Sequence, residues 1–176
     1  VSIRSTTEIV EEQERGIAIA SDSFAADIVL QAFQNTSVRV DITANSLSLK
    51  WSKLLLNILG NASSAILDML PDEVYASSSL FAIEQAAFRE ALVILQQMKI
   101  PIINLPGMPA RVLAAAMQIA PPSILRPILQ NRVGMGRGHK PPSLLLALRG
   151  NQRRTEVAWL NGAVVRAAHK FHQLSP

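Results

Sequence analysis

A long apolar helix predicted over residues 50–66, KWSKLLLNILGNASSAI, constrains the fold of this chain more than any other segment. Its apolar side chains occur on nearly all sides at helical spacing, which is typical of a helix inside a domain. Lys53, Asn57 and Asn61 interrupt it at intervals of four residues. Four residues turn an α-helix by about 400°, so these polar side chains form one stripe that rises about 12 Å.

This polar stripe must either find partners inside the domain or face a wet cleft. An unpaired buried polar group costs about 1–3 kcal/mol, and a buried charge costs more. In one interpretation, Lys53 extends along apolar surface to solvent while Asn57 and Asn61 tie neighbouring helices together. In the other, the stripe lines a functional site. The stripe alone favours the first interpretation, and the rest of the chain bears on the choice.

The composition is that of a globular chain with one sizeable core. Of the 176 residues, 49% are hydrophobic and only 17% are charged, which argues against disorder. No apolar run reaches the roughly 18 to 20 residues that a membrane span requires, so we expect no membrane helix. The chain has no cysteine, which excludes disulfides, thiol catalysis and thiolate metal sites and fits a cytoplasmic protein.

The charge pattern favours a small anionic ligand rather than a nucleic acid. The net charge is +4, but aromatic residues make up only 5% of the chain and the basic residues are scattered. Surfaces that bind nucleic acid normally combine basic and aromatic side chains. We therefore expect a small-molecule ligand and no nucleic-acid partner.

The first 44 residues have the pattern of an α/β unit. Residues 9–10 and 16–20 are predicted to form a hairpin, a helix follows to about residue 33, and residues 37–43 alternate as a strand does. So few elements cannot make a covered parallel sheet. Because the chain also begins with Val1 rather than Met, we interpret it as a processed or truncated piece that starts near the end of a larger domain.

From residue 45 onward the pattern is helical. Asn45 or Ser46 can cap the central helix, which Pro71 ends. Further helices are predicted over residues 77–98, 109–120 and 123–132, a glycine-rich loop over 134–138, and a last helix from residue 151 or 152 to about residue 172. We therefore predict a mainly α fold.

Other candidate sites give weaker signals. The glycines of residues 134–138 lack the GxGxxG spacing, so the chain has no dinucleotide fingerprint of its own. His169 and His172 are spaced as metal ligands can be, but no third ligand lies nearby in sequence, and we expect no metal site. Glu156 opens an apolar helix and could simply complement its dipole. Ser143 could cap a short helix, with plain capping favoured over anion binding.

Four motifs in a fixed order resemble the ketopantoate reductase family (2-dehydropantoate 2-reductases). They are KWSKLLLN with a second asparagine four residues later, REAL followed by LPG, KPPS, and RTEV followed by LNGAVV, at residues 50–61, 89–107, 140–143 and 154–165. The resemblance covers about residues 15–172. It implies a helical domain like the C-terminal domain of 6-phosphogluconate dehydrogenase at residues 45–176. Residues 1–44 would be the incomplete tail of a Rossmann-type domain.

The resemblance also implies a reaction and the roles of particular residues. Lys53 would be the general acid that protonates the oxygen as NADPH delivers hydride to the C2 carbonyl of a 2-oxo acid. Asn57 and Asn61 would orient the substrate and the lysine, Ser143 would hold the substrate carboxylate, and Glu156 would lie near the substrate hydroxyl and the nicotinamide. The implied reaction converts 2-dehydropantoate to pantoate in pantothenate biosynthesis, with NADPH bound mainly by the missing Rossmann domain.

The sequence departs from the family in places that bear on activity. An acidic residue common a few places after the serine is replaced by Ala147, and the chain stops at Pro176, before the family's last helix would be complete. The family's N-terminal glycine fingerprint is also absent from this sequence, so we expect the chain alone to be inactive. Two alternatives stay open: a related reductase for another 2-oxo acid, and a non-catalytic helical module that dimerises through apolar helices. A homodimer is compatible with each of these interpretations.

Overall fold

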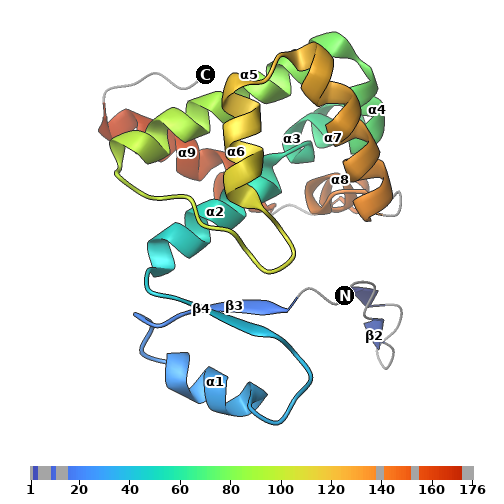
Figure 1. Ribbon diagram of the computed structural model, residues 1–176. Helices are drawn as coiled ribbons and strands as arrows, with labels where there is room; N and C mark the ends of the chain where they lie inside the picture. The colour runs from blue at the N-terminus through green and yellow to red at the C-terminus, as the bar shows by residue number, and fades with distance from the viewer. Residues whose placement is uncertain (1, 4–8, 11–15, 138–140, 152–154, 172–176) are drawn as a thin grey trace.

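The computed structural model describes residues 2–3, 9–10, 16–137, 141–151 and 155–171. It consists of a small α/β unit and a larger helical part, joined by helix α2 (Ser46–Ile58) (Figure 1). Helices account for most of the described chain, so the prediction of a mainly α fold is confirmed.

The α/β unit is built on a parallel pair of strands. β3 (Ile17–Ala20) pairs in parallel with β4 (Val40–Thr43), and α1 (Ala26–Phe33) connects them, as a parallel pair requires. β1 (Ser2–Ile3) and β2 (Ile9–Val10) form a separate antiparallel pair. The predicted hairpin between residues 9–10 and 16–20 is therefore wrong, because the alternation of a strand does not reveal which strand it pairs with.

Two polar contacts fix the start of α2 against the α/β unit. The Asn45 side chain accepts the backbone N–H of Ser48 at 2.9 Å, which confirms the predicted cap. Asp22, just after β3, accepts both the backbone N–H and the hydroxyl of Ser46 at 3.0 Å. A carboxylate at a helix N-terminus also complements the helix dipole. The first turn of α2 is thus held from both sides of the junction.

The predicted central helix is broken into two. α2 ends at Ile58, and α3 (Asn61–Leu67) begins after Gly60, whose φ of 64° is left-handed. A left-handed residue ends the helical hydrogen-bond ladder, and only glycine adopts that conformation without steric cost. A Cβ at Gly60 would also lie 3.1 Å from the Cβ of Pro71. The apolar spacing continues across the break, which is why it predicted one helix.

The remaining helices surround a shared core. They are α4 (Pro71–Ala76), α5 (Ser78–Gln97), α6 (Ala110–Ile119), α7 (Pro122–Arg137), α8 (Ser143–Arg149), the short 3-10 helix η1 (Glu156–Ala158) and α9 (Asn161–Lys170). The predicted helix over residues 77–98 is confirmed, with Ser77 as its cap. The predicted loop over residues 134–138 is wrong up to residue 137, where α7 continues, and residue 138 lies outside the described residues. The last helix begins later than predicted.

The core of the helical part is formed by one face of α2 and the buried faces of its neighbours. From α2 come Trp51, Leu55 and Ile58. The other helices contribute a larger set of buried apolar side chains, among them Val74, Phe81, Phe88, Ala91, Leu95, Met117, Leu129, Val164 and Ala168. Each buried large side chain contributes about 1.5–3 kcal/mol, so this packing fixes the rotation of α2. The opposite side of α2 is left to face a pocket.

Candidate active site

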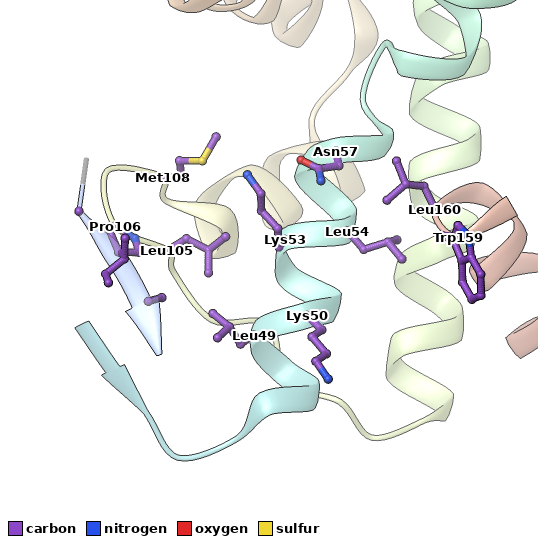
Figure 2. Close-up of a pocket in the computed structure, with 13 residues that line it drawn as sticks. Leu49, Lys50, Lys53, Leu54, Asn57, Leu105, Pro106, Met108, Trp159 and Leu160 are labelled. Atoms are coloured by element: carbon purple, nitrogen blue, oxygen red, sulfur yellow. The ribbon is translucent and has the colours of Figure 1, made fainter. Parts of the chain in front are cut away.

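One face of α2 forms the floor of a pocket. Lys50, Lys53, Leu54 and Asn57 line it and are spaced three or four residues apart, which places them on one side of the helix. Figure 2 shows them along α2, with the two lysine side chains extending in different directions. The predicted stripe therefore begins in an open pocket. Lys53 is exposed and Asn57 is half-buried.

The walls of the pocket come from segments that are distant in sequence. Residues 16–18 at the start of β3 and the turn at residues 105–108 form one side, and Trp159 with Leu160 forms the other (Figure 2). The pocket has a volume of about 680 Å³. Volumes of roughly 300–1,000 Å³ are usual for small-molecule sites. The pocket thus lies between the α/β unit and the helical part.

The segment that leads into the turn at residues 105–108 is bound to α2 through a buried hydroxyl. Leu105 and Met108 exchange backbone hydrogen bonds of 3.0 and 2.8 Å, and Gly107 between them has a φ of 67°. The hydroxyl of Ser52, which is fully buried on α2, accepts the backbone N–H of Ile103 at 2.9 Å. The KWSK and LPG motifs therefore belong to one pocket, with the serine as their link.

The lining favours an anion with an apolar body. The described residues that line the pocket include two lysines and an asparagine but no carboxylate, and the rest are apolar or glycine. Cations in a cleft with low-dielectric walls attract negative charge. This agrees with the small anionic ligand that the composition favours.

A second group of predicted residues is joined by direct hydrogen bonds. Asn61, only 3% exposed at the start of α3, donates its amide N–H to Oε1 of Glu156 at 3.2 Å. Its amide oxygen accepts the backbone N–H of Leu144 at 3.3 Å. The hydroxyl of Ser143 donates to the same Oε1 of Glu156. The side chain of Asn61 thus connects α3, α8 and η1.

The predicted site residues therefore fall into two groups. Lys53 and Asn57 line the pocket, whereas Asn61, Ser143 and Glu156 form the hydrogen-bonded network and are not among the described residues of the lining. Chain connections relate the groups: Asn57 lies one turn before the α2–α3 break, and η1 leads from Glu156 directly into the Trp159 wall.

The structure changes the interpretation of Ser143. Pro142 occupies the cap position of α8, and Ser143 is the first helical residue, with its hydroxyl directed to Glu156 instead of a backbone N–H. The favoured expectation of plain capping is therefore wrong. Glu156, expected to open a long helix, begins the 3-10 helix η1 instead.

Several site residues were not identifiable as such from the sequence. Lys50 had a signal, since it lies three residues before Lys53 on the same helix face. Trp159 had none: its helical spacing suggested an interior position, yet it is 76% exposed and lines the pocket. Ser52 had none either, because its partner lies far along the chain.

The described part of the chain contains no cluster of three or more His, Asp or Glu side chains that could hold a metal ion. His169 is exposed at the end of α9, and His172 lies outside the described residues. Among the helices with described residues, none has both the length and the apolar character to span a membrane.

Comparison with known proteins identifies the helical part. The family model for the ketopantoate reductase PanE/ApbA C-terminal domain matches residues 45–174. A comparison with curated protein sequences found no significant match.

Two solved structures share the fold. D-mandelate dehydrogenase in complex with NADH is 20% identical with a TM-score of 0.62, over 89% of this chain and 47% of that chain. A PanE/ApbA family ketopantoate reductase from Ralstonia eutropha JMP134 is 17% identical with a TM-score of 0.63, over 86% of this chain and 44% of that chain. The chain thus spans about half the length of these structures.

Proposed function

The chain belongs to the ketopantoate reductase family, and on that premise we propose that it forms the substrate-binding part of an NADPH-dependent reductase that converts 2-dehydropantoate to pantoate. The observation that carries the proposal is the arrangement on α2. Lys53 and Asn57 line a pocket whose described lining has no carboxylate, and Asn61 continues along the chain into the network with Ser143 and Glu156.

In the proposed reaction, Lys53 is the general acid. NADPH, when bound, supplies the hydride that adds to C2 of the 2-oxo acid. Negative charge then develops on the carbonyl oxygen, and the Lys53 ammonium donates a proton to that oxygen, which yields the alcohol. Lys53 then regains a proton from solvent. Its exposed position in the pocket supports this step.

The hydrogen-bonded network would hold the acid end of the substrate. The Ser143 hydroxyl donates to Glu156, and in the proposed complex it donates to the substrate carboxylate instead. Hydrogen bonds to charged groups contribute about 1.5–3 kcal/mol, enough to determine which way a small acid enters. Asn57 and Asn61 would orient the substrate beside Lys53, and Glu156 would lie near the substrate hydroxyl and the nicotinamide.

The residues of this chain fit only one end of the cofactor. The apolar walls around Met108 and Trp159, with a pocket of about 680 Å³, could enclose a flat nicotinamide ring together with a small acid. The sequence has no glycine-rich phosphate cradle. We propose that a Rossmann-type domain outside this chain binds the rest of the cofactor.

The proposal is tested by NADPH oxidation with 2-dehydropantoate, using the protein expressed from the complete reading frame that contains this chain. We expect Lys53→Ala to lower kcat by about 100- to 10,000-fold, the usual contribution of a positioned acid, with little change in folding stability. Lys170→Ala is the control, since it removes an exposed lysine on α9 that is not among the described residues of the pocket lining. Near-normal turnover by Lys53→Ala would contradict the role of Lys53.

A second candidate is a reductase of the same build for a 2-oxo acid with a larger apolar side chain. The apolar walls and the 76% exposed Trp159 favour it. A panel of 2-oxo acids with small, branched and aromatic side chains separates the two candidates by kcat/KM. Absence of both NADPH binding and turnover in the complete protein would instead favour a non-catalytic helical interaction module.

A further inference from the structure

A buried carboxylate outside the pocket contacts the start of α3. Glu84, on α5, is only 8% exposed, and both of its carboxylate oxygens accept hydrogen bonds. Oε2 accepts the backbone N–H of Gly60 at 2.7 Å, and Oε1 accepts the hydroxyl of Ser63. Burying a carboxylate costs free energy unless its oxygens accept hydrogen bonds, so the positions of Gly60 and Ser63 relative to Glu84 are tightly constrained.

The two contacts of Glu84 lie on either side of Asn61. Gly60 is the left-handed residue that ends α2 geometry, and Ser63 lies in the first turn of α3. The backbone of a glycine such as Gly60 has more conformational freedom than that of any other residue type, because glycine has no Cβ. A carboxylate that holds its N–H therefore fixes the conformation from which the Asn61 side chain projects.

Asn61 transmits this position to the other predicted site residues. Its amide group binds Glu156 at 3.2 Å and the backbone of Leu144 at 3.3 Å, and Ser143 shares the same Glu156 oxygen. Because Asn61 is almost fully buried, a shift of the α2–α3 break cannot be absorbed by free rotation of its side chain.

We propose that Glu84 is a positioning residue for this site. It holds the α2–α3 break so that Asn61, and through it Glu156 and Ser143, keep the geometry that substrate reduction requires. Glu84 does not act on the substrate itself, because it lines a separate pocket of about 370 Å³ between α3, α5 and α9. The kinetic part of this inference rests on the proposed reductase function.

Three substitutions in the complete protein separate the contributions of Glu84. Glu84→Ala removes both acceptors, and we expect kcat with the 2-oxo acid to fall by about tenfold or more, since small misplacements of site groups are costly. Glu84→Gln should retain most activity, because its amide oxygen can accept from Gly60 and its amide N–H can donate to Ser63. The side chain of Asp in Glu84→Asp is too short to reach both Gly60 and Ser63, so we expect its kcat to lie between those of Glu84→Ala and Glu84→Gln. If Glu84→Ala does not fold, Glu84→Asp takes its place in the comparison.

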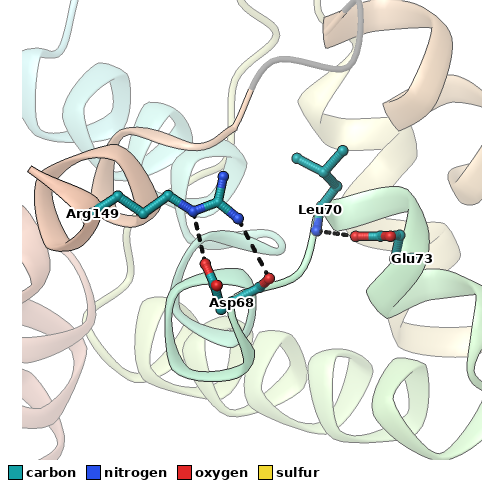
Figure 3. A network of polar contacts seen from close by, with 4 residues as sticks. All are labelled: Asp68, Leu70, Glu73 and Arg149. Atoms are coloured by element: carbon teal, nitrogen blue, oxygen red, sulfur yellow. Dashed lines mark hydrogen bonds and ion pairs between the residues drawn. The ribbon is translucent and has the colours of Figure 1, made fainter.

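A control removes a similar carboxylate elsewhere. Glu73 accepts the backbone N–H of Leu70 at 2.6 Å at the start of α4 (Figure 3), whereas the Asn61 side chain binds Glu156 and the backbone of Leu144. We expect Glu73→Ala to lower thermal stability slightly and to leave kcat unchanged. A fall in kcat equal to that of Glu84→Ala would mean that loss of any helix-start carboxylate has this effect, and would overturn the proposal.

A double-mutant cycle distinguishes positioning from a purely structural role. If Glu84 acts through Asn61, the pair Glu84→Ala with Asn61→Ala should have the kcat of Asn61→Ala alone. If the fold reductions in kcat of the two single substitutions instead multiply in the double variant, the proposal is overturned. If the wild-type protein reduces no 2-oxo acid, the reductase proposal fails separately. The positioning inference is then tested by the NMR signal of the Asn61 side-chain amide, which should shift in Glu84→Ala and stay in place in Glu73→Ala; an unchanged signal in Glu84→Ala would refute it.

Discussion

One carboxylate oxygen of Glu156 accepts hydrogen bonds from both Asn61 and Ser143. Asn61 is buried and its amide N–H is committed to that oxygen, whereas Ser143 is exposed and its hydroxyl can rotate. An arriving carboxylate can therefore recruit Ser143 more easily than Asn61. The two residues should differ in what their loss does to the kinetics.

We expect Ser143→Ala to raise KM for the 2-oxo acid by about tenfold and to change kcat less, because the lost hydrogen bond to a charged group is made in both the bound substrate and the transition state. Steady-state kinetics of the complete protein measures this. Ser79→Ala, an exposed serine on α5, is the control. An unchanged KM would remove Ser143 from the carboxylate site.

Features whose signal is local could be predicted from the sequence. Helical spacing put Lys53 and Asn57 on one helix face, and both line the pocket, while their roles in the reaction stay predictions. Ser52 and Glu84 could not be found in this way, because their partners lie 51 and 24 residues away and only the folded chain brings them together. Contacts between distant segments leave no periodic pattern in one sequence.

At the scale of elements, the break between α2 and α3 depends on one residue. The apolar spacing predicted a single helix through residue 66, since a kink changes hydrogen bonding without changing which side chains are apolar. Gly60 was visible in the sequence, but an isolated glycine is tolerated within helices and does not by itself indicate an end. The left-handed φ of Gly60 and its closeness to Pro71 show that this glycine does mark the end of a helix.

We expect Gly60→Ala to reduce the free energy of unfolding by at least about 1–2 kcal/mol, the usual cost of a left-handed alanine, with further loss from contact with Pro71. Urea unfolding measures the change. Gly162→Ala in α9 is the control, because Gly162 is not left-handed. Its Cβ would lie 3.1 Å from the end of the Arg166 side chain and at an ordinary contact distance of 3.6 Å from the carbonyl oxygen of Val157. The control should be neutral or more stable by up to about 1 kcal/mol. Equal losses would refute a special role for Gly60.

The two tryptophans of the chain lie in different regions of the molecule. Trp51 is 9% exposed within the core, whereas Trp159 is 76% exposed in the pocket wall, with the Arg166 guanidinium 5.9 Å from its ring. Both follow apolar helical spacing in the sequence, so the fold class was predictable while the division between core and pocket was not. That division depends on where helices from distant parts of the chain meet.

Of the two tryptophans of this chain, we expect Trp159 to respond to a bound 2-oxo acid. Titration with the acid alone, without NADPH because reduced nicotinamide quenches buried indoles by energy transfer, should give a spectral change that persists in Trp51→Phe and disappears in Trp159→Phe. The physical reason is that a bound molecule would replace the water against the exposed indole, whereas the core indole has little water to lose. A change that survives in Trp159→Phe would show that binding occurs elsewhere.

The tie between Asp22 and the first turn of α2 has a mechanical consequence. The pocket floor belongs to α2, and one of its walls belongs to β3, so these hydrogen bonds join the two sides of the pocket at one end. Asp22 and Ser46 thereby fix where the β3 wall lies relative to the α2 floor that carries Lys53. Side chains that never meet a ligand can therefore set how large a ligand is admitted.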